Sequence, residues 1–169
     1  MAEPKGIPML RQSFTYQLAS MAEDAVGPAA RLFERRFGLN VHELRVLRLI
    51  DDQPGVTFTT LARLTRFERS ATSRILSKLV KAGLVQRSID DDDARQFRLH
   101  ATNRGKALRE RADPLSLEIE KLILSSLSAS ERTELRRLLD KLSGWINSEF
   151  VPELERRYPD AGTPTKRGK

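Results

Sequence analysis

The 169-residue sequence contains no cysteine, and this absence removes several classes of function. Disulfides, thiol-based redox sensing and thiolate nucleophiles all require cysteine, as do the usual structural zinc sites. The two histidines, His42 and His100, lie far apart in the sequence and do not have the spacing of a ligand pair. We therefore predict neither a metal site nor a cofactor.

Long apolar segments and aromatic residues are also scarce. No run of about eighteen apolar residues occurs, and the first ten residues, MAEPKGIPML, lack the apolar core of a signal peptide. These features predict a cytoplasmic protein with no membrane partner. Aromatic residues make up only 6% of the chain, while leucine and isoleucine recur at helical spacing, which favours a mostly helical protein.

Recognisable catalytic groupings are missing as well. The sequence shows no phosphate-binding loop and no nucleophile paired with a base. Four consecutive aspartates at positions 90–93 do form an acidic cluster, but they are expected at the exposed tip of a hairpin. An enzyme is therefore the least favoured class of protein.

Positive charge, in contrast, is abundant and concentrated in one region. The chain has 30 Lys and Arg against 23 Asp and Glu, a net charge of +7. Residues 57–89 alone contain seven Lys or Arg and one acid, a net charge of +6 in one fifth of the length. This concentration is expected of a surface that binds a polyanion, although a solvated face would have the same composition.

The N-terminal part of the sequence has a helical pattern. Apolar residues recur at three- and four-residue steps over residues 10–37, which predicts an amphipathic helix. Gly27 and Pro28 interrupt this pattern, so the segment is either one kinked helix or two abutting pieces. Gly38 then supplies a stop.

Three further helices are predicted over the next forty or so residues. Asn40 and Glu43 have the spacing of a capping box at the start of a second helix, and Thr57 is a candidate N-cap for a third. A turn at 66–68 leads to a fourth helix over residues 69–82, with its apolar side facing the core. The order is that of a helix-turn-helix.

Two strands are predicted after the fourth helix. Gly83 closes that helix because it adopts the left-handed conformation easily, and a strand begins at Leu84. In the returning strand Phe97 and Leu99 point to one side and the polar residues between them to the other, which indicates a half-buried strand. Val56 is placed to pair briefly with this hairpin.

The last third of the sequence predicts two more helices. Thr102 is a candidate cap for a long helix that Pro114 should kink, and Ser128 with Glu131 forms a second capping box. Apolar stripes in both terminal arms predict burial against each other and against a second copy of the chain, with ordinary packing within one chain as the alternative. Residues 151–169 have the composition of a flexible tail.

The run GLVQRSIDDDDARQFRLHAT, followed by NRGKAL, resembles the wing of the MarR (multiple antibiotic resistance regulator) family. Members show G-L-[VI]-x-R, then D-x-x-D-x-R, then a strand that ends in L-T-x-x-G. The matching residues are Gly83, Leu84, Val85, Arg87, Asp90, Asp93, Arg95, Thr102 and Gly105. Asp91, where proline is common, and Ala101, where a larger aliphatic residue is common, depart from the pattern.

The resemblance implies a mostly α-helical, winged helix-turn-helix protein with a two-stranded wing hairpin. It divides the chain into an N-terminal dimerisation helix (10–37), a DNA-binding lobe (38–102), C-terminal dimerisation helices (103–150) and a tail (151–169). It implies a ligand-responsive regulator of transcription, above all a repressor, that binds double-stranded DNA at a pseudo-palindromic operator as a homodimer. A small anionic or aromatic effector would release it. The alternative is a winged-helix module that binds other proteins without sequence-specific DNA binding.

The exposed face of the fourth predicted helix supplies the candidates for DNA binding. Short polar and cationic side chains there can reach base edges and phosphates in the major groove. The candidates are Arg69, Ser70, Ser73, Arg74, Ser77 and Lys78. Ser70, Ser73 and Arg74 are favoured for base edges or nearby phosphates, and Arg69, Lys78 and Lys81 for phosphates. A solvated helix surface is the alternative for each of them.

Two further sets of residues follow from the resemblance. Arg95 is the candidate for insertion into the minor groove at the wing tip, and Asp90 and Asp93 would orient arginines rather than touch DNA. An effector would lie between the dimerisation helices and the DNA-binding lobe. The residues with suitable chemistry near that junction are Phe14, Tyr16, Met21, His42 and Arg45, for which core, cap or surface positions are the alternative.

Overall fold

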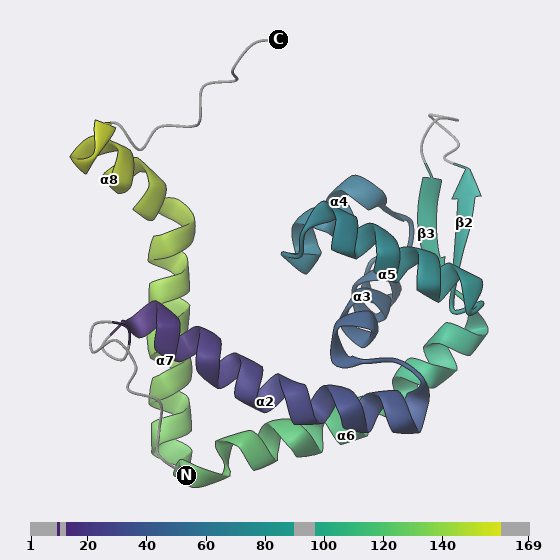
Figure 1. Ribbon diagram of the computed structural model, residues 1–169, viewed down its shortest axis with the longest axis horizontal. Helices are drawn as coiled ribbons and strands as arrows, with labels where there is room; N and C mark the ends of the chain where they lie inside the picture. The colour runs from purple at the N-terminus through teal and green to yellow at the C-terminus, as the bar shows by residue number, and fades with distance from the viewer. Residues whose placement is uncertain (1–9, 11–12, 90–96, 160–169) are drawn as a thin grey trace. The chain divides into compact units, whose positions relative to one another are not determined.

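The computed structural model describes residues 10, 13–89 and 97–159 (Figure 1). The chain divides into two compact units, a first unit of residues 1–120 and a second unit of residues 121–169, which are described in turn. The first unit holds a helix-turn-helix and a small antiparallel sheet. The predicted mostly helical, winged fold is therefore confirmed.

The first long helix is α2 (Phe14–Phe37). Ser13 caps it by accepting a backbone N–H of the first turn on its hydroxyl oxygen. Pro28 lies inside the helix, so the segment is one helix rather than two abutting pieces. Gly38 ends it with a φ of 71°, in the left-handed region that glycine adopts without a steric penalty.

The helix α3 (Val41–Asp52) begins at the predicted capping box. The Asn40 side-chain oxygen accepts from the backbone N–H of Glu43, and a Glu43 carboxylate oxygen accepts from that of Asn40, both at 3.0 Å. Thr57 caps α4 (Phe58–Thr65) in the predicted way. The recognition helix of the motif is α5 (Arg69–Lys81), which ends before the turn at Gly83, where φ is 68°.

A buried pair of threonines holds the turn between α4 and α5. The hydroxyl oxygens of Thr65 and Thr72 lie 3.0 Å apart, and both side chains are buried. Thr65 also donates to the carbonyl oxygen of Ala62, and Thr72 to that of Glu68. Because buried hydroxyls are costly without partners, these bonds fix how α5 leaves the turn. No local pattern in the sequence predicts this pair.

The sheet contains β1 (Val56–Thr57), β2 (Val85–Ile89) and β3 (Phe97–Ala101), in the order β1-β3-β2, all antiparallel. Val56 pairs with Leu99, so the predicted two-stranded wing hairpin gains a short third strand. Leu99 is buried, whereas Phe97 on the same side is 51% exposed because it lies farther along the wing, paired with exposed Ile89.

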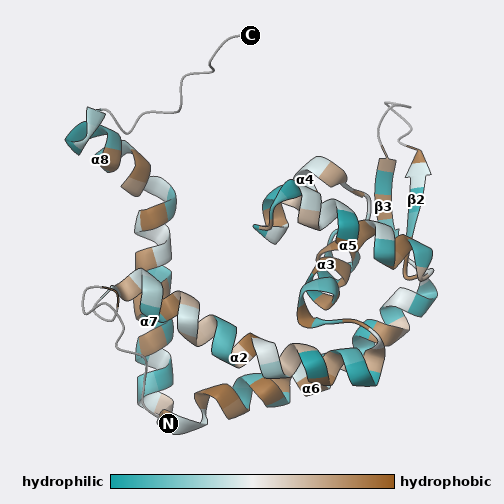
Figure 2. Cartoon of the chain, in the orientation of Figure 1, coloured by the Kyte–Doolittle hydropathy of each residue, from teal (hydrophilic) through white to brown (hydrophobic). Residues whose placement is uncertain are grey.

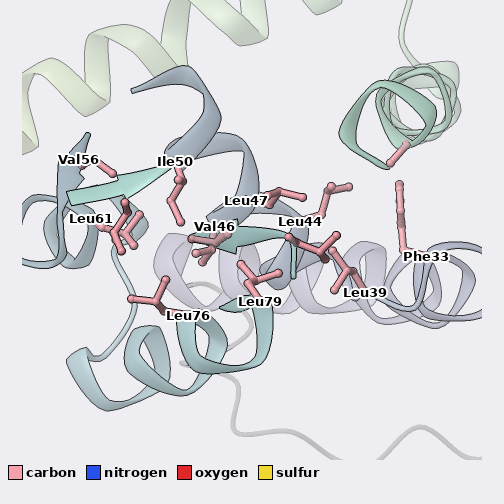
Figure 3. Close-up of a cluster of buried hydrophobic side chains, with 14 residues drawn as sticks. Phe33, Leu39, Leu44, Val46, Leu47, Ile50, Val56, Leu61, Leu76 and Leu79 are labelled. Atoms are coloured by element: carbon pink, nitrogen blue, oxygen red, sulfur yellow. The ribbon is translucent and has the colours of Figure 1, made fainter. Parts of the chain in front are cut away.

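The core of the first unit is a single apolar cluster to which α2, α3, α4, α5, the strands and α6 (Asn103–Ile123) all contribute (Figure 3). Its buried members are Phe33, Leu39, Leu44, Val46, Leu47, Ile50, Val56, Leu61, Leu76, Leu79, Leu84, Val85, Leu99 and Ala112. Burial of this many aliphatic side chains is the main source of the unit's stability.

The helix α6 begins directly against the wing. The Thr102 hydroxyl donates to the carbonyl oxygen of Gly83 at 2.7 Å and accepts from the backbone N–H of Gly105 at 3.1 Å. Gly105 is buried, and a Cβ atom there would lie 2.2 Å from the carbonyl oxygen of Leu84. Only glycine therefore fits at this position without movement of the backbone.

An ion-pair network joins α3 to α6 within the first unit. Arg109 of α6 contacts Asp51 at 2.8 Å, Asp52 at 2.6 Å and Asp113 at 3.2 Å. Arg48 of α3 donates to Asp113 at 2.7 Å. Burial lowers the pKa of Arg109, but hydrogen bonds to the three aspartates outweigh it and hold that pKa above the usual arginine value. The network thus fixes the first half of α6 on α3.

The second unit contains the end of α6, a 3-10 turn η1 (Leu124–Ser126), α7 (Ala129–Ser148) and α8 (Phe150–Arg157). The predicted capping box of Ser128 and Glu131 starts α7. Among the described residues, none of η1, α7 or α8 is buried. Apolar bands nevertheless recur along α7 (Figure 2). The exposed large apolar residues of α7 are Leu135, Leu138, Leu139, Trp145 and Ile146.

The helix α8 occupies the first part of the segment 151–169, for which the sequence predicts a flexible tail. Residues 151–157 are helical, and the Glu153 carboxylate accepts hydrogen bonds from Arg156 and Arg157 one turn later. Pairs at this spacing stabilise a helix, and an aromatic contact between Trp145 and Phe150 joins α8 to α7. Amino-acid composition does not reveal these pairs, because they depend on the spacing of Glu153 from the two arginines.

Candidate nucleic-acid interface

The helical period of α5 separates its side chains into two faces. Thr72, Leu76 and Leu79 are buried in the lobe. The predicted DNA-binding residues Arg69, Ser70, Ser73, Arg74, Ser77 and Lys78 are all exposed. The structure thus places the six candidates on one accessible helix surface, which has the width to enter a major groove. Their contacts with DNA stay a prediction.

The two arginines at the start and middle of this surface differ in how they are held. The Arg69 guanidinium carbon lies 4.8 Å from the centre of the Phe58 ring, so the guanidinium packs over an aromatic ring at the start of α4. Its N–H groups stay available for an acceptor. Among the described residues, Arg74 makes no hydrogen bond or ion pair and is free to meet a base edge or a phosphate.

A hollow of about 620 Å³ lies where α4, α5 and the wing strands meet. Its lining residues are Thr57, Phe58, Thr59, Thr60, Arg69, Ser73, Leu76, Arg87, Phe97 and Leu99. Two guanidiniums and several hydroxyls give this hollow the donors that a phosphate group requires. Arg87 and the hydroxyls of Thr59 and Thr60 therefore join the candidate interface.

Sequence reasoning assigned no DNA contact to Arg87. A signal was available, because Arg87 is the final residue of the G-L-V-x-R segment. It is exposed, although it pairs with buried Leu99 and lies on the same side of the sheet. What the sequence could not supply was the neighbour, since Arg69 comes from a different element and lines the same hollow.

Lys78 has a different environment from the other candidates. Its ammonium nitrogen lies 2.8 Å and 2.9 Å from the two carboxylate oxygens of Glu43 on α3. The side chain of Glu43 is only 7% exposed, while that of Lys78 is 47% exposed. The predicted role of Lys78 as a phosphate anchor therefore competes with an ion pair that is already formed.

Asp90, Asp93 and Arg95 lie outside the described residues, so their predicted roles stay predictions. The strands that carry the tip are described, and β2 and β3 pair over five residues each.

The five predicted effector residues are not brought together. His42 and Arg45 of α3 both contact the Phe67 ring, at 5.1 Å and 5.3 Å from its centre, beside the turn of the helix-turn-helix. Phe14, Tyr16 and Met21 are instead exposed on the first half of α2, and Phe33, where α2 enters the core, lies roughly 28 Å from Phe14 at 1.5 Å per residue. Sequence spacing could not reveal this separation.

The side chains of the interface are cations and hydrogen-bond donors, and this chemistry indicates which kind of ligand it can bind. Within residues 10, 13–89 and 97–159, no group of three or more His, Cys, Asp or Glu side chains could hold a metal ion. Over the same residues, every helix is too short or too polar to span a lipid bilayer. The interface described above offers positive charge and hydrogen-bond donors, which are the groups that bind a nucleic-acid backbone.

Comparison with known families gives a match over the winged region. The sequence profile of the MarR family matches residues 37–96. This range includes α3, α4, α5 and β2, and therefore the whole helix-turn-helix.

Individual relatives extend the similarity to most of the chain. The HTH-type transcriptional repressor Rv2887 of Mycobacterium tuberculosis is 32% identical over 105 residues, which are 62% of this chain and 76% of that protein. The homoprotocatechuate degradative operon repressor of Escherichia coli is 27% identical over 145 residues, 85% of this chain and 97% of that protein. The crystal structure of Rv2887 in complex with p-aminosalicylic acid aligns with a TM-score of 0.64 and 27% identity, covering 78% of this chain and 98% of that chain.

Proposed function

Because the chain belongs to the MarR family of transcriptional regulators, we propose that it is a repressor that binds a pseudo-palindromic operator as a homodimer. The family and the relatives are regulators of transcription and not enzymes, as the sequence predicted. A protein with this function works on the chromosome and hence in the cytoplasm.

The observation that carries the proposal is the exposed face of α5. Short hydroxyl side chains alternate there with Arg69 and Arg74, and the hollow beside it adds Arg87 from the wing. In the proposed complex Ser70, Ser73 and Arg74 contact base edges or nearby phosphates, and the guanidiniums of the hollow receive a backbone phosphate. Arg95 would enter the minor groove beside the major groove that α5 occupies.

Exposed apolar side chains support the homodimer. On α7, Leu138 and Leu139 are 47% and 42% exposed, and Leu122 near the end of α6 is 71% exposed. Apolar stripes of this kind on helices are commonly buried in an interface between chains. Two copies related by a two-fold axis would present two α5 helices to half-sites about one helical turn, roughly 34–36 Å, apart.

A small aromatic acid is the proposed effector. The structure of Rv2887 contains p-aminosalicylic acid, and the repressor from E. coli is named for homoprotocatechuate degradation, so both names include an aromatic carboxylic acid. Release requires that the effector binds the two arrangements of the dimer with different affinity, typically by ~1–3 kcal/mol. The Arg45 guanidinium, beside the rings of Phe67 and His42, is one place where such an acid could be held.

The test is selection of a binding duplex from a random pool, followed by mobility-shift titration against a scrambled duplex at two salt concentrations. We expect tight binding to the selected duplex and loss of that binding on Arg74→Glu, with the dimer retained in sedimentation velocity. Equal binding to both duplexes would favour the alternative, a winged-helix module that binds proteins.

The wing is tested separately with Arg95→Ala. This variant should weaken binding to all sequences and reduce the slope of log K against log salt by about 1, because one phosphate contact is lost. An unchanged slope and affinity would remove Arg95 from the interface. Asp90→Asn and Asp93→Asn should act more weakly, since exposed ion pairs contribute only ~0–1 kcal/mol.

A further inference from the structure

One carboxylate serves two helices of the winged lobe. A Glu43 oxygen accepts the backbone N–H of Asn40 at 3.0 Å and so completes the cap of α3. The same carboxylate accepts from the Lys78 ammonium at 2.8 Å and 2.9 Å, which ties α3 to α5. Glu43 is 6% exposed, so water competes little for these bonds.

The position of this contact makes it more than a surface ion pair. Leu76 and Leu79 anchor the inner side of α5 in the core, but apolar packing allows small rotations about the helix axis. The contact between Lys78 and Glu43 lies at the edge of that packed side and is directional. It therefore restricts the rotation that decides which side chains of α5 face outward.

The same contact changes the charge that α5 presents. Arg74 lines a shallow hollow together with Glu43 and Lys78, yet among the described residues it has no ion pair, whereas Lys78 has one. A cation that is already paired releases few counterions when DNA approaches, because its charge is neutralised before binding. Arg74 is thus the cation that remains for DNA on this part of the helix.

We propose that Glu43 is a positioning residue for sequence-specific DNA binding, acting through Lys78. It fixes the rotation of α5 on α3, and it withholds the Lys78 ammonium from the phosphates. This inference rests on the proposed function, because positioning for DNA has meaning only if α5 reads DNA. It removes Lys78 from the predicted set of phosphate anchors.

The test compares four variants of the full chain: Lys78→Met, Glu43→Gln, the double variant, and Arg74→Gln as a matched loss of one cation on the same helix. Glutamine retains an oxygen that can cap α3, so Glu43→Gln should fold. Each protein is titrated with the duplex selected from a random pool and with a scrambled duplex of the same length, over a series of salt concentrations.

The expected results distinguish a lysine that contacts a DNA phosphate from a lysine that is paired with Glu43. Arg74→Gln should lower the slope of log K against log salt by about 1, whereas Lys78→Met should leave it unchanged. Glu43→Gln frees the ammonium, so binding to the scrambled duplex should tighten with a slope steeper by about 1. The ratio of selected to scrambled affinity should fall by about tenfold in this variant. The double variant should lose the gain on the scrambled duplex.

A slope that falls by about 1 in Lys78→Met would overturn the proposal, because Lys78 would then contact a phosphate. An unchanged affinity ratio in Glu43→Gln would overturn it as well. A merely structural ion pair would lower stability in both variants but would not steepen the salt dependence on the scrambled duplex.

A measurement without DNA distinguishes this inference from the proposed function. In urea unfolding, the two single substitutions should be non-additive, since each removes the same contact. Additive losses would show that the contact does not hold α5, whatever the protein binds. The wild-type chain could bind the selected and the scrambled duplex equally while the two substitutions are non-additive in unfolding. In that case the proposed function would be wrong, but the Lys78–Glu43 contact would still hold α5 on α3.

Discussion

The two units of the chain differ in what happens to their apolar side chains. In the first unit, leucines of α3, α4, α5 and the sheet are withdrawn from water into a single cluster. In the second unit, no described residue of α7 or α8 is buried, although α7 has an apolar side chain on nearly every turn. An apolar stripe on a helix thus predicts burial in both units, but within one chain only the stripes of the first unit are buried.

The capping boxes show the same contrast at the level of a motif. Asn40 with Glu43 and Ser128 with Glu131 have the same spacing and the same reciprocal hydrogen bonds. Glu43 is buried and also pairs with Lys78 on α5. Glu131 is exposed, and among the described residues its carboxylate bonds only to Ser128 of the cap. A motif therefore sets the local geometry, and the surroundings decide whether it has a second use.

The largest difference between the units should appear when a leucine is truncated in each. Leu47→Ala removes a side chain with no exposed surface and should cost about 2–5 kcal/mol of unfolding free energy in urea. Leu138→Ala, the matched change on α7, should alter the unfolding free energy of a monomer by only about 0.5 kcal/mol. Its loss of stability relative to the wild-type chain should instead grow with protein concentration, because the proposed dimer contributes less to the stability of the variant.

Equal losses for Leu47→Ala and Leu138→Ala at every protein concentration would contradict this contrast. They would mean that α7 is buried within one chain as fully as α3. The comparison should be made by urea titration at two protein concentrations that differ a hundredfold or so.

Gly105→Ala should have the next largest effect. The added Cβ would lie 2.2 Å from the carbonyl oxygen of Leu84, and a backbone atom cannot swing aside as a side-chain end does. We expect a loss of about 1–3 kcal/mol in unfolding free energy, as for other overpacked sites. Hydrogen exchange should show the loss first at Thr102, whose backbone N–H donates to the same carbonyl at 3.0 Å.

A destabilisation below about 0.5 kcal/mol would show that the start of α6 can move away from the wing. Gly83→Ala serves as a control for lost backbone freedom, since among the described residues a Cβ there would meet only Arg104, at 4.0 Å, but φ is 68°. Its cost should come from the left-handed conformation alone, at about 1–2 kcal/mol.

These residues also show what the sequence could and could not predict. Gly38, Gly83 and the two capping boxes are local signals, and each ended or started a helix where the pattern indicated. The exposed face of α5 followed from helical period, so its six candidates were placed correctly on the surface.

Contacts between distant elements were not predictable in this way. Lys78 and Glu43 are separated by 35 positions, and Arg109 and Asp51 by 58, so no spacing rule joins them. The separation of the predicted effector residues within one chain could not be foreseen for the same reason, since α2 carries Phe14 away from α3. Their role in binding an effector stays a prediction. The sequence pattern therefore predicts which side of a helix or strand is exposed to solvent. The partner that a charged residue finds on another element determines its role.

Gly144→Ala is the counterpart of Gly105→Ala in the second unit. A Cβ at Gly144 meets nothing within 4 Å among the described residues, and the residue lies inside α7. Alanine should therefore stabilise the protein by about 0.5–1 kcal/mol, because it loses less conformational freedom in a helix. The measurement is urea unfolding at fixed protein concentration. A loss of stability that grows with protein concentration would instead place a second copy directly on Gly144.

The smallest expected effect is the pH dependence of the exposed cap. Hydrogen bonds from the Ser128 hydroxyl and backbone lower the pKa of Glu131 below its usual value of 4.5. A carboxylate with a lowered pKa in the folded state adds stability that is complete above the unfolded pKa, and this is lost as the pH falls through the folded value. We therefore expect the first turn of α7 to lose hydrogen-exchange protection below about pH 4. Ser128→Ala should remove this dependence, and a first turn whose protection is the same at pH 3 and pH 6 in the wild-type chain would show that the cap does not form in solution.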